Sequence, residues 1–401
     1  MAVPTSPARA LPYVYASTTL MMMAYSLITV ALPFRFQALG LSVLQYGTVL
    51  AVYALGMLVT ESLWGVAAFR IGRASVLSGL GALVAVVVVA IGLAQSFLAF
   101  AATLGLLGMF AIFPIPLGRW LAVTARGPGT GGSGSGRYGL FFGLGLVAGT
   151  STGPLVYVEF GFLSLAIASA AIFLTASLLL ASIRWREVGL PPRDRGTLAQ
   201  VRDLLHRHFL LCSALVVFYF LAYTLTINFL QYYSVSLFGG TPTDAGYVIG
   251  ASRGVGVVAG LLLGPTVDRW GPERTSPLGF LLLAAGALGT FFAVGYGSMV
   301  AATLLFSVGT GWLSASILPL ALGPVPRSVQ GTAVGVFGSF EDLGLLIGPI
   351  LIGSVYSAYG AHSVFPVVAG LALGGCAFAL VLPRWTGRPT GPLAPTLPEH
   401  V

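Results

Sequence analysis

The chain has 401 residues, of which 57% are hydrophobic and only 7% are charged, a composition that excludes an ordinary soluble domain. Its formal net charge of +8 comes from arginine alone, because the sequence contains no lysine. Apolar runs recur along the chain, each long enough to cross a hydrocarbon core of roughly 30 Å as a helix of about 20 residues. We therefore predict an all-α membrane protein.

The hydrophobic runs, separated by turn residues, predict about twelve transmembrane helices. The first run, from Leu11 to about Pro33, is longer than the core of a secretory signal and predicts the first span. The helices of the first half are centred near Ser26, Leu55, Val86, Gly108, Leu146 and Phe173. Those of the second half are centred near Ala222, Gly256, Ala285, Val308, Leu346 and Ala369.

The one long polar segment, Arg184 to His208, holds six arginines, three acids and two adjacent prolines. Such a hydrated segment cannot lie in hydrocarbon, where every unpaired backbone group is costly. The predicted organisation is therefore an N-terminal six-helix bundle (1–183), a cytoplasmic linker (184–208), a C-terminal six-helix bundle (209–384) and a cytoplasmic tail (385–401).

The arginines are distributed unevenly between the two sides of the predicted membrane. With the N-terminus inside, 17 of the 19 fall on one side, and the other two, Arg35 and Arg253, fall inside predicted spans. An excess of basic residues marks the cytoplasmic side of a membrane protein. We therefore predict a multi-pass protein of the plasma (inner) membrane with both termini cytoplasmic, and we attribute the basic charge to topology, not to nucleic-acid binding.

The two halves share equivalent positions, which indicates an internal repeat. At an offset of 199, the matching pairs are Gly47 with Gly246, Gly65 with Gly264, Arg70 with Arg269, and Gly72 with Gly271. At an offset of 195, they are Gly149 with Gly344, Gly153 with Gly348, and Pro154 with Pro349. Internal repeats are typical of transporters, whose substrate site lies between the repeats near the membrane midplane.

Three motifs resemble those of the major facilitator superfamily. The loop Gly65-Val-Ala-Ala-Phe-Arg-Ile-Gly-Arg73 resembles the family's Gly-x-x-x-Asp-Arg-x-Gly-Arg signature, and Gly264-Pro-Thr-Val-Asp-Arg-Trp-Gly271 is similar to it in the second half. The fifth helix carries Gly145-x3-Gly149-x3-Gly153-Pro154, which resembles a motif of the family's antiporters. The resemblance covers nearly the whole chain and implies two pseudo-symmetric six-helix bundles, closest in motifs to the 12-helix drug/proton antiporter-like branch.

The resemblance implies a conformational latch in the two signature loops. Its residues are Gly65, Arg70, Gly72 and Arg73 in the first half and Gly264, Asp268, Arg269 and Gly271 in the second. Asp268 is expected at the N-terminus of a neighbouring helix, where a negative charge gains about 0.3–1 kcal/mol. Phe69 replaces the aspartate of the first loop, so that latch cannot be electrostatic, and we expect opening to the cytoplasm to be favoured.

The Gly-x3-Gly spacing predicts close helix packing, because it places small residues on one helix face. The alternative is that the spacing reflects the abundance of glycine, which occurs 54 times. The predicted packing residues are Gly145, Gly149, Gly153 and Pro154 in the first half and Gly344, Gly348 and Pro349 in the second.

Five charged residues fall inside predicted spans: Arg35, Glu61, Arg253, Glu341 and Asp342. A charge at a helix centre costs about 2.5–3.5 kcal/mol, so each must pair, become neutral or face water. Arg253 and the two acids lie at similar depth. They form either a buried ion pair between helices, or a site where Arg253 binds substrate or exchanges partners with an acid that takes up a proton. Adjacent carboxylates point about 100° apart on a helix, and the resemblance favours Asp342 for the cavity.

Glu61 is either a proton site or the partner of a loop arginine, and Arg35 either belongs to the site or extends its head to the lipid headgroups. Further candidates for lining a pocket are polar or aromatic, namely Asn228, Gln231, Tyr232, Tyr233 and Trp312.

These features predict a secondary active transporter that moves a small organic solute by alternating access. No phosphate-binding motif is present, so an ion gradient must supply the energy, and protons are favoured because desolvated carboxylates can titrate. The leading interpretation is proton-coupled efflux of a lipophilic compound. The alternative is a proton-coupled organic-anion transporter, for example for a monocarboxylate, that uses Arg253.

A membrane-embedded enzyme is the third interpretation, and the distribution of histidine argues against it. His206, His208 and His400 fall in the linker or the tail, which leaves His362 alone on the outer side. We therefore expect no enzymatic activity, no metal and no cofactor. The expected partners are a small-molecule substrate and the lipid bilayer, and the protein is expected to function as a monomer.

Overall fold

The computed structural model of the protein describes residues 7–68, 74–111, 113, 115, 118, 121, 131–183, 207–323, 325 and 330–386. The first half contains α1 (Pro7–Ala38), α2 (Val43–Ala68), α3 (Ala74–Leu93), α4 (Phe97–Ala111) and α6 (Gly131–Ala181). The second contains α9 (Arg207–Thr224), the π-helix η1 (Leu225–Phe229), α10 (Leu230–Ser236), α11 (Pro242–Trp270), α12 (Pro272–Phe291), α13 (Tyr296–Leu322), α14 (Gln330–Tyr359), the 3-10 helix η3 (Ala361–Ser363) and α15 (Val364–Thr386).

All twelve expected helix centres lie on helices, and no strand occurs among the described residues, so the all-α prediction is confirmed. The expected fifth and sixth helices are the two arms of α6. They join at Gly161, whose φ of 79° glycine adopts far more readily than other residues do. Nine helices in the described part of the chain are long and apolar enough to cross a membrane.

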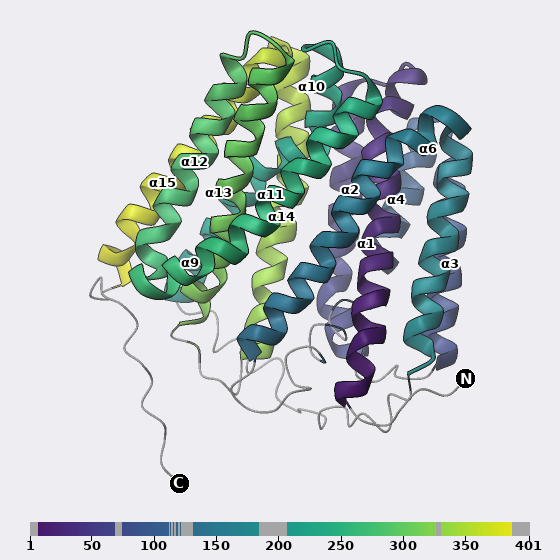
Figure 1. Ribbon diagram of the computed structural model, residues 1–401, viewed down its shortest axis with the longest axis horizontal. Coiled ribbons are helices and arrows are strands. Elements are labelled where there is room, and N and C mark those ends of the chain that lie inside the picture. Colours follow the sequence, from purple (N-terminus) through teal and green to yellow (C-terminus); the bar gives the residue numbers. More distant parts are fainter. Residues whose placement is uncertain are drawn as a thin grey trace.

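The helices form two groups that follow the two halves of the chain. In Figure 1 the purple and blue helices of the first half lie mostly to the right of the green and yellow helices of the second half. Residues 184–206 of the expected linker and 387–401 of the expected tail lie outside the described residues, and α9 already begins at Arg207. Helix α1 begins on the lower side of Figure 1, and helices α6 and α15 end there. The arginine distribution predicts that this side is cytoplasmic. We call it the inner side and the opposite one the outer side.

Two equivalent contacts join the halves on the outer side. Gly47 of α2 lies against the carbonyl oxygen of Pro349 in α14. Gly246 of α11 lies against Pro154 of α6, and a Cβ added to it would be 2.5 Å from Pro154 Cγ. The repeated glycine of each half therefore meets the repeated proline of the other half. We call these two contacts the glycine–proline seats.

A third connection across the halves lies beside the first seat. The Tyr46 hydroxyl of α2 donates a hydrogen bond to the backbone oxygen of Asn228 in η1 at 3.0 Å. The Tyr46 ring also lies edge-on to Phe229, with 5.4 Å between ring centroids. Short π-helical segments are frequent at functional sites. Together with the two seats, this contact closes the outer side of the protein.

The Gly-x3-Gly residues lie against the first helix of their own half. In α6, Gly145, Gly149 and Gly153 contact α1, and a Cβ on Gly153 would be 2.7 Å from the backbone oxygen of Leu27. In α14, Gly344 and Gly348 contact α9 in the same way. The small residues therefore allow the close helix approach that their spacing predicts.

Replacing Gly149 with alanine should destabilise the protein, because its Cβ would overlap the Met23 carbonyl oxygen and the Ser26 hydroxyl of α1. Overpacking of this kind costs about 1–3 kcal/mol, so the unfolding temperature in detergent should fall. Gly139 lies in the same helix with no neighbouring atom within 4 Å of an added Cβ. Gly139→Ala is therefore the matched control, and equal unfolding temperatures for the two variants would contradict the packing argument.

Candidate functional site

Arg253 lies near the middle of α11 and contacts the other half of the protein. Its Nη1 donates a hydrogen bond to the Thr150 hydroxyl of α6 at 2.5 Å. The Thr150 hydroxyl in turn donates to the backbone oxygen of Leu146 at 2.5 Å. Thr150 is fully buried, whereas Arg253 is half-buried. This hydrogen bond therefore links the two halves at mid-depth.

Three tyrosines lie within electrostatic range of Arg253: Tyr25 of α1, Tyr46 of α2 and Tyr223 of α9. Tyr25 and Tyr223 also lie within range of each other, although they belong to different halves. Both are half-buried, like Arg253. These side chains come from helices of both halves and gather around Arg253. We call Arg253, Thr150 and these three tyrosines the central site.

Each half contributes a stacked pair of tyrosines at this site. In the first half, the ring centroids of Tyr25 and Tyr53 are 5.8 Å apart, with 24° between the ring planes. In the second half, the rings of Tyr219 and Tyr223 are 5.4 Å apart and nearly parallel, at 9°. Offset-stacked rings at such distances attract each other. The two tyrosine pairs form aromatic surfaces on both sides of the central site.

The two adjacent acids of α14 have different neighbours. Asp342 is only 6% exposed and lies within electrostatic range of Tyr53 in the other half. Glu341 is half-buried and lies within range of Tyr219 in its own half. This difference follows from the angular separation of consecutive side chains on a helix. Asp342 is thus the acid that faces across the halves.

The hydrogen bond of Arg253 reaches a hydroxyl in this conformation. Among the described residues, its partner is Thr150, and no ion pair joins Arg253 to Glu341 or Asp342. The structure therefore shows the guanidinium held by a neutral group of the other half.

The polar candidates of the seventh span lie on the outer side of the central site. Asn228 accepts the Tyr46 hydrogen bond through its backbone, and the fully buried Gln231 lies near Tyr46. The Tyr232 hydroxyl lies 3.4 Å from the Tyr356 hydroxyl of α14. These residues therefore lie among the contacts that join the halves on the outer side, and Tyr46 connects those contacts to the central site.

Two other candidates lie away from the central site. The Trp312 indole of α13 donates to the Thr266 hydroxyl at 3.1 Å, and its ring is 6.4 Å from that of Trp270, at the inner end of α11. Arg35 lies near the outer end of α1, half-buried, with its guanidinium carbon 5.8 Å from the centre of the Phe162 ring. This geometry is that of a cation–π contact.

The expected latch is described only in the second half. Asp268 and Arg269 are exposed in the last turn of α11, and Gly271, with a φ of 82°, turns the chain into α12. No neighbouring atom lies within 4 Å of a Cβ added to Gly264. Phe69, Arg70, Gly72 and Arg73 lie outside the described residues, and Glu61 and Gly65 lie on α2 with nothing described beyond their backbone.

Sequence reasoning missed the tyrosines and Thr150. Tyr25, Tyr53, Tyr219 and Tyr223 lie in apolar runs, where an aromatic residue more often faces lipid or core. Thr150 lies within the Gly-x3-Gly motif, and its position beside Gly149 was the one available signal. Within the described residues, no three His, Cys, Asp or Glu side chains gather in a way that could hold a metal ion.

Comparisons with known proteins agree with this architecture. The model of the Major Facilitator Superfamily matches residues 14–341 and 212–398. The multidrug resistance protein MdtG of Serratia proteamaculans (strain 568) is 27% identical over 405 residues, which cover 94% of each chain. MdtG of Citrobacter koseri is 26% identical over 372 residues, which cover 87% of this chain and 89% of the relative.

Several solved transporter structures share the fold. A bacterial homologue of the human lysosomal transporter Spinster, in an inward-facing and occupied conformation, has a TM-score of 0.79 at 15% identity and covers 95% of this chain and 97% of its own. The human organic anion transporter MFSD10 has a TM-score of 0.68 at 17% identity, with 93% and 99% covered. At such identities the likeness shows the fold alone.

Proposed function

Because this chain belongs to the Major Facilitator Superfamily and is a multi-pass membrane transporter, we propose that it exports a lipophilic organic compound in exchange for protons. The observation that carries this proposal is the central site, which both halves build at mid-depth behind a closed outer side. The name of the MdtG relatives, multidrug resistance protein, supports export of a foreign compound. In such a cycle the halves would rock about the central site and expose it alternately to each side.

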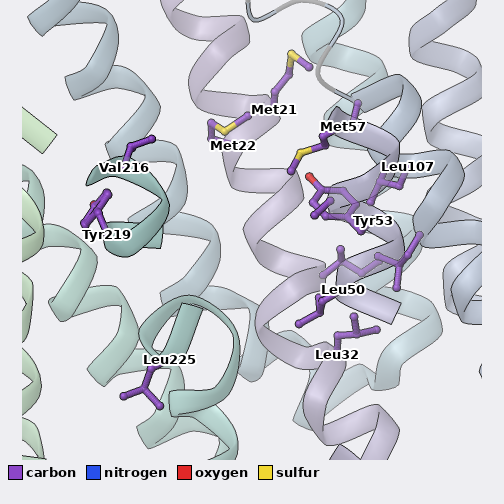
Figure 2. Packing of buried hydrophobic residues seen from close by; sticks show 14 of the residues in the cluster. Met21, Met22, Leu32, Leu50, Tyr53, Met57, Leu107, Val216, Tyr219 and Leu225 are labelled. Carbon is purple, nitrogen blue, oxygen red and sulfur yellow. The ribbon is translucent and has the colours of Figure 1, made fainter. Parts of the chain in front are cut away.

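The side chains around the central site suit a lipophilic compound. The tyrosine pairs offer aromatic surfaces, and Figure 2 shows Met57 beside Tyr53 in the first half. Methionine side chains are flexible and polarisable, so they adapt to ligands of different shapes. A site with these properties would accept aromatic compounds of different shapes.

Asp342 is the group that we assign to proton coupling. It is buried near the middle of α14 and lies near Tyr53 of the other half. A charged carboxylate is costly at this depth, so it favours proton uptake when the site is closed and proton release when water enters. No bound cofactor is needed for this cycle. We further propose that a single chain suffices, because one chain supplies the whole central site, and that both termini are cytoplasmic.

The proposed export can be tested in bacterial cells that express the protein. The cells are loaded with ethidium, a lipophilic cation, or with fluorescein, an aromatic anion, and intracellular fluorescence is followed. We expect lower accumulation of at least one compound than in cells without the protein, and a protonophore should remove the difference. Equal accumulation of both compounds in the two strains would refute export.

A second candidate function rests on Arg253. A half-buried arginine at the centre of the site favours an organic anion as substrate, which could also enter together with protons. The same cells distinguish the two functions, because symport would raise the intracellular fluorescein signal when the external medium is acidified.

A further inference from the structure

We propose that the central site binds planar aromatic compounds that carry a carboxylate. The carboxylate would replace Thr150 as the partner of Arg253, and the ring would lie between the Tyr25–Tyr53 and Tyr219–Tyr223 pairs. The inference rests on the proposed function, for which it names the class of compound.

The hydrogen bonding of Arg253 favours a carboxylate as its ligand. A guanidinium presents five N–H donors in a planar fork that matches the two oxygens of a carboxylate. Among the described residues, a single hydroxyl, that of Thr150, accepts a hydrogen bond from Arg253. That hydroxyl is neutral and already donates its own proton to Leu146. A bidentate carboxylate would bind more strongly than this partner and would also neutralise the charge at a depth where charge is costly.

The two tyrosine pairs lie in the same order between Arg253 and the acids of α14. Tyr25 and Tyr223 are the members of the two pairs that lie within range of Arg253. Their stacked partners, Tyr53 and Tyr219, lie within range of the acids of α14. In each tyrosine pair, one ring thus lies toward Arg253 and the other toward an acid of α14.

This order fixes the orientation of a bound ligand. A compound with its carboxylate at Arg253 would place its ring beside the half-buried Tyr25 and Tyr223, where stacking is favourable. The reverse orientation would place the carboxylate near Glu341 and Asp342, whose negative charges would repel it. A cationic compound would be repelled by Arg253. An uncharged aromatic compound would gain only the stacking on the tyrosines. An aliphatic carboxylate would gain only the ion pair with Arg253.

The test is a binding measurement on the purified full-length protein in nanodiscs. Anthracenecarboxylate, whose fluorescence anisotropy reports binding directly, is compared with anthracenecarboxamide and with cyclohexanecarboxylate as competitors. We expect the carboxylate to bind at least about tenfold more tightly than either analogue. Charge-assisted bidentate hydrogen bonds contribute more binding free energy than a tenfold difference in affinity requires. Equal affinities for the carboxylate and the carboxamide would overturn the inference.

Variants assign the two contacts. Arg253→Gln should remove the preference for carboxylate over carboxamide, and Arg384→Gln, an exposed arginine at the inner end of α15, should keep it. Tyr223→Leu should weaken binding of both aromatic compounds, and Tyr223→Phe, which keeps the ring, should not. A preference that survives Arg253→Gln would overturn the inference. If that variant does not fold, the comparison of ligands on the unmodified protein still decides.

Failure of the inference and failure of the proposed function give different results. If cells export ethidium and the purified protein shows no preference for the aromatic carboxylate, the inference falls and export stands. If the purified protein binds anthracenecarboxylate selectively and cells export neither compound, the site is assigned correctly and the direction of transport is wrong.

Discussion

Replacing Asp342 with asparagine is expected to abolish proton-driven export. The amide has nearly the same size and fits the same buried position, but it cannot take up or release a proton. Export of the compound should therefore no longer respond to a pH gradient, although binding at Arg253 should persist. The measurement is uptake into inside-out membrane vesicles, with and without an imposed gradient.

Two further substitutions give this result its meaning. Glu341→Gln changes the adjacent acid, which faces its own half, and should reduce export less than Asp342→Asn does. Glu159→Gln changes an exposed acid at the outer end of the first arm of α6 and should leave export unchanged. Full gradient-driven export by Asp342→Asn would remove this residue from the coupling mechanism.

Replacing Gly47 with tryptophan is expected to open the outer side. The glycine lies against the Pro349 carbonyl, so a large side chain can be accommodated only if α2 and α14 separate. Overpacking costs about 1–3 kcal/mol, and a bias of that size against the closed state changes its population ratio by roughly 5–150-fold. Gly246→Trp at the equivalent seat should act in the same way.

The opening can be measured as a distance between spin labels on the outer loops. Gln95, between α3 and α4, and Val294, between α12 and α13, are exposed positions in different halves. The two native cysteines are buried and can be replaced beforehand. Gly47→Trp should lengthen the distance, whereas Gly139→Trp, at an unobstructed glycine, should leave it unchanged. Unchanged distances in Gly47→Trp would show that this seat does not hold the outer side closed.

Much of the fold could be predicted because a membrane restricts the possibilities. Apolar runs of helix-spanning length can only be helices in lipid, and the offsets between Gly47 and Gly246 and between Pro154 and Pro349 indicated two related halves. The pairing of each glycine with the proline of the opposite half could not be predicted, because it depends on how the halves dock. The π-helix η1 was also missed, because the seventh apolar run has no one-sided hydrophobic pattern that an extra residue in a turn would shift.

Only the charged residues of the candidate site could be predicted from the sequence, because burying a charge is costly. Arg253 and Asp342 could be selected because a charge inside a span requires a reason. The tyrosine pairs could not, because an apolar run does not show which of its aromatic residues face inward. For the same reason, the sequence suggested Trp312 as a pocket residue, whereas the structure places it beside Trp270 at the inner end of α11.

The most direct test of gradient-driven exchange uses proteoliposomes with a pH-sensitive dye inside. A compound that cells export is added outside as a concentration gradient, at equal internal and external pH. If the compound and protons are exchanged, compound entry should drive protons out, and the interior should become alkaline in the native protein but not in Asp342→Asn. An interior that acidifies as the compound enters would establish symport, and an unchanged internal pH would contradict proton coupling altogether.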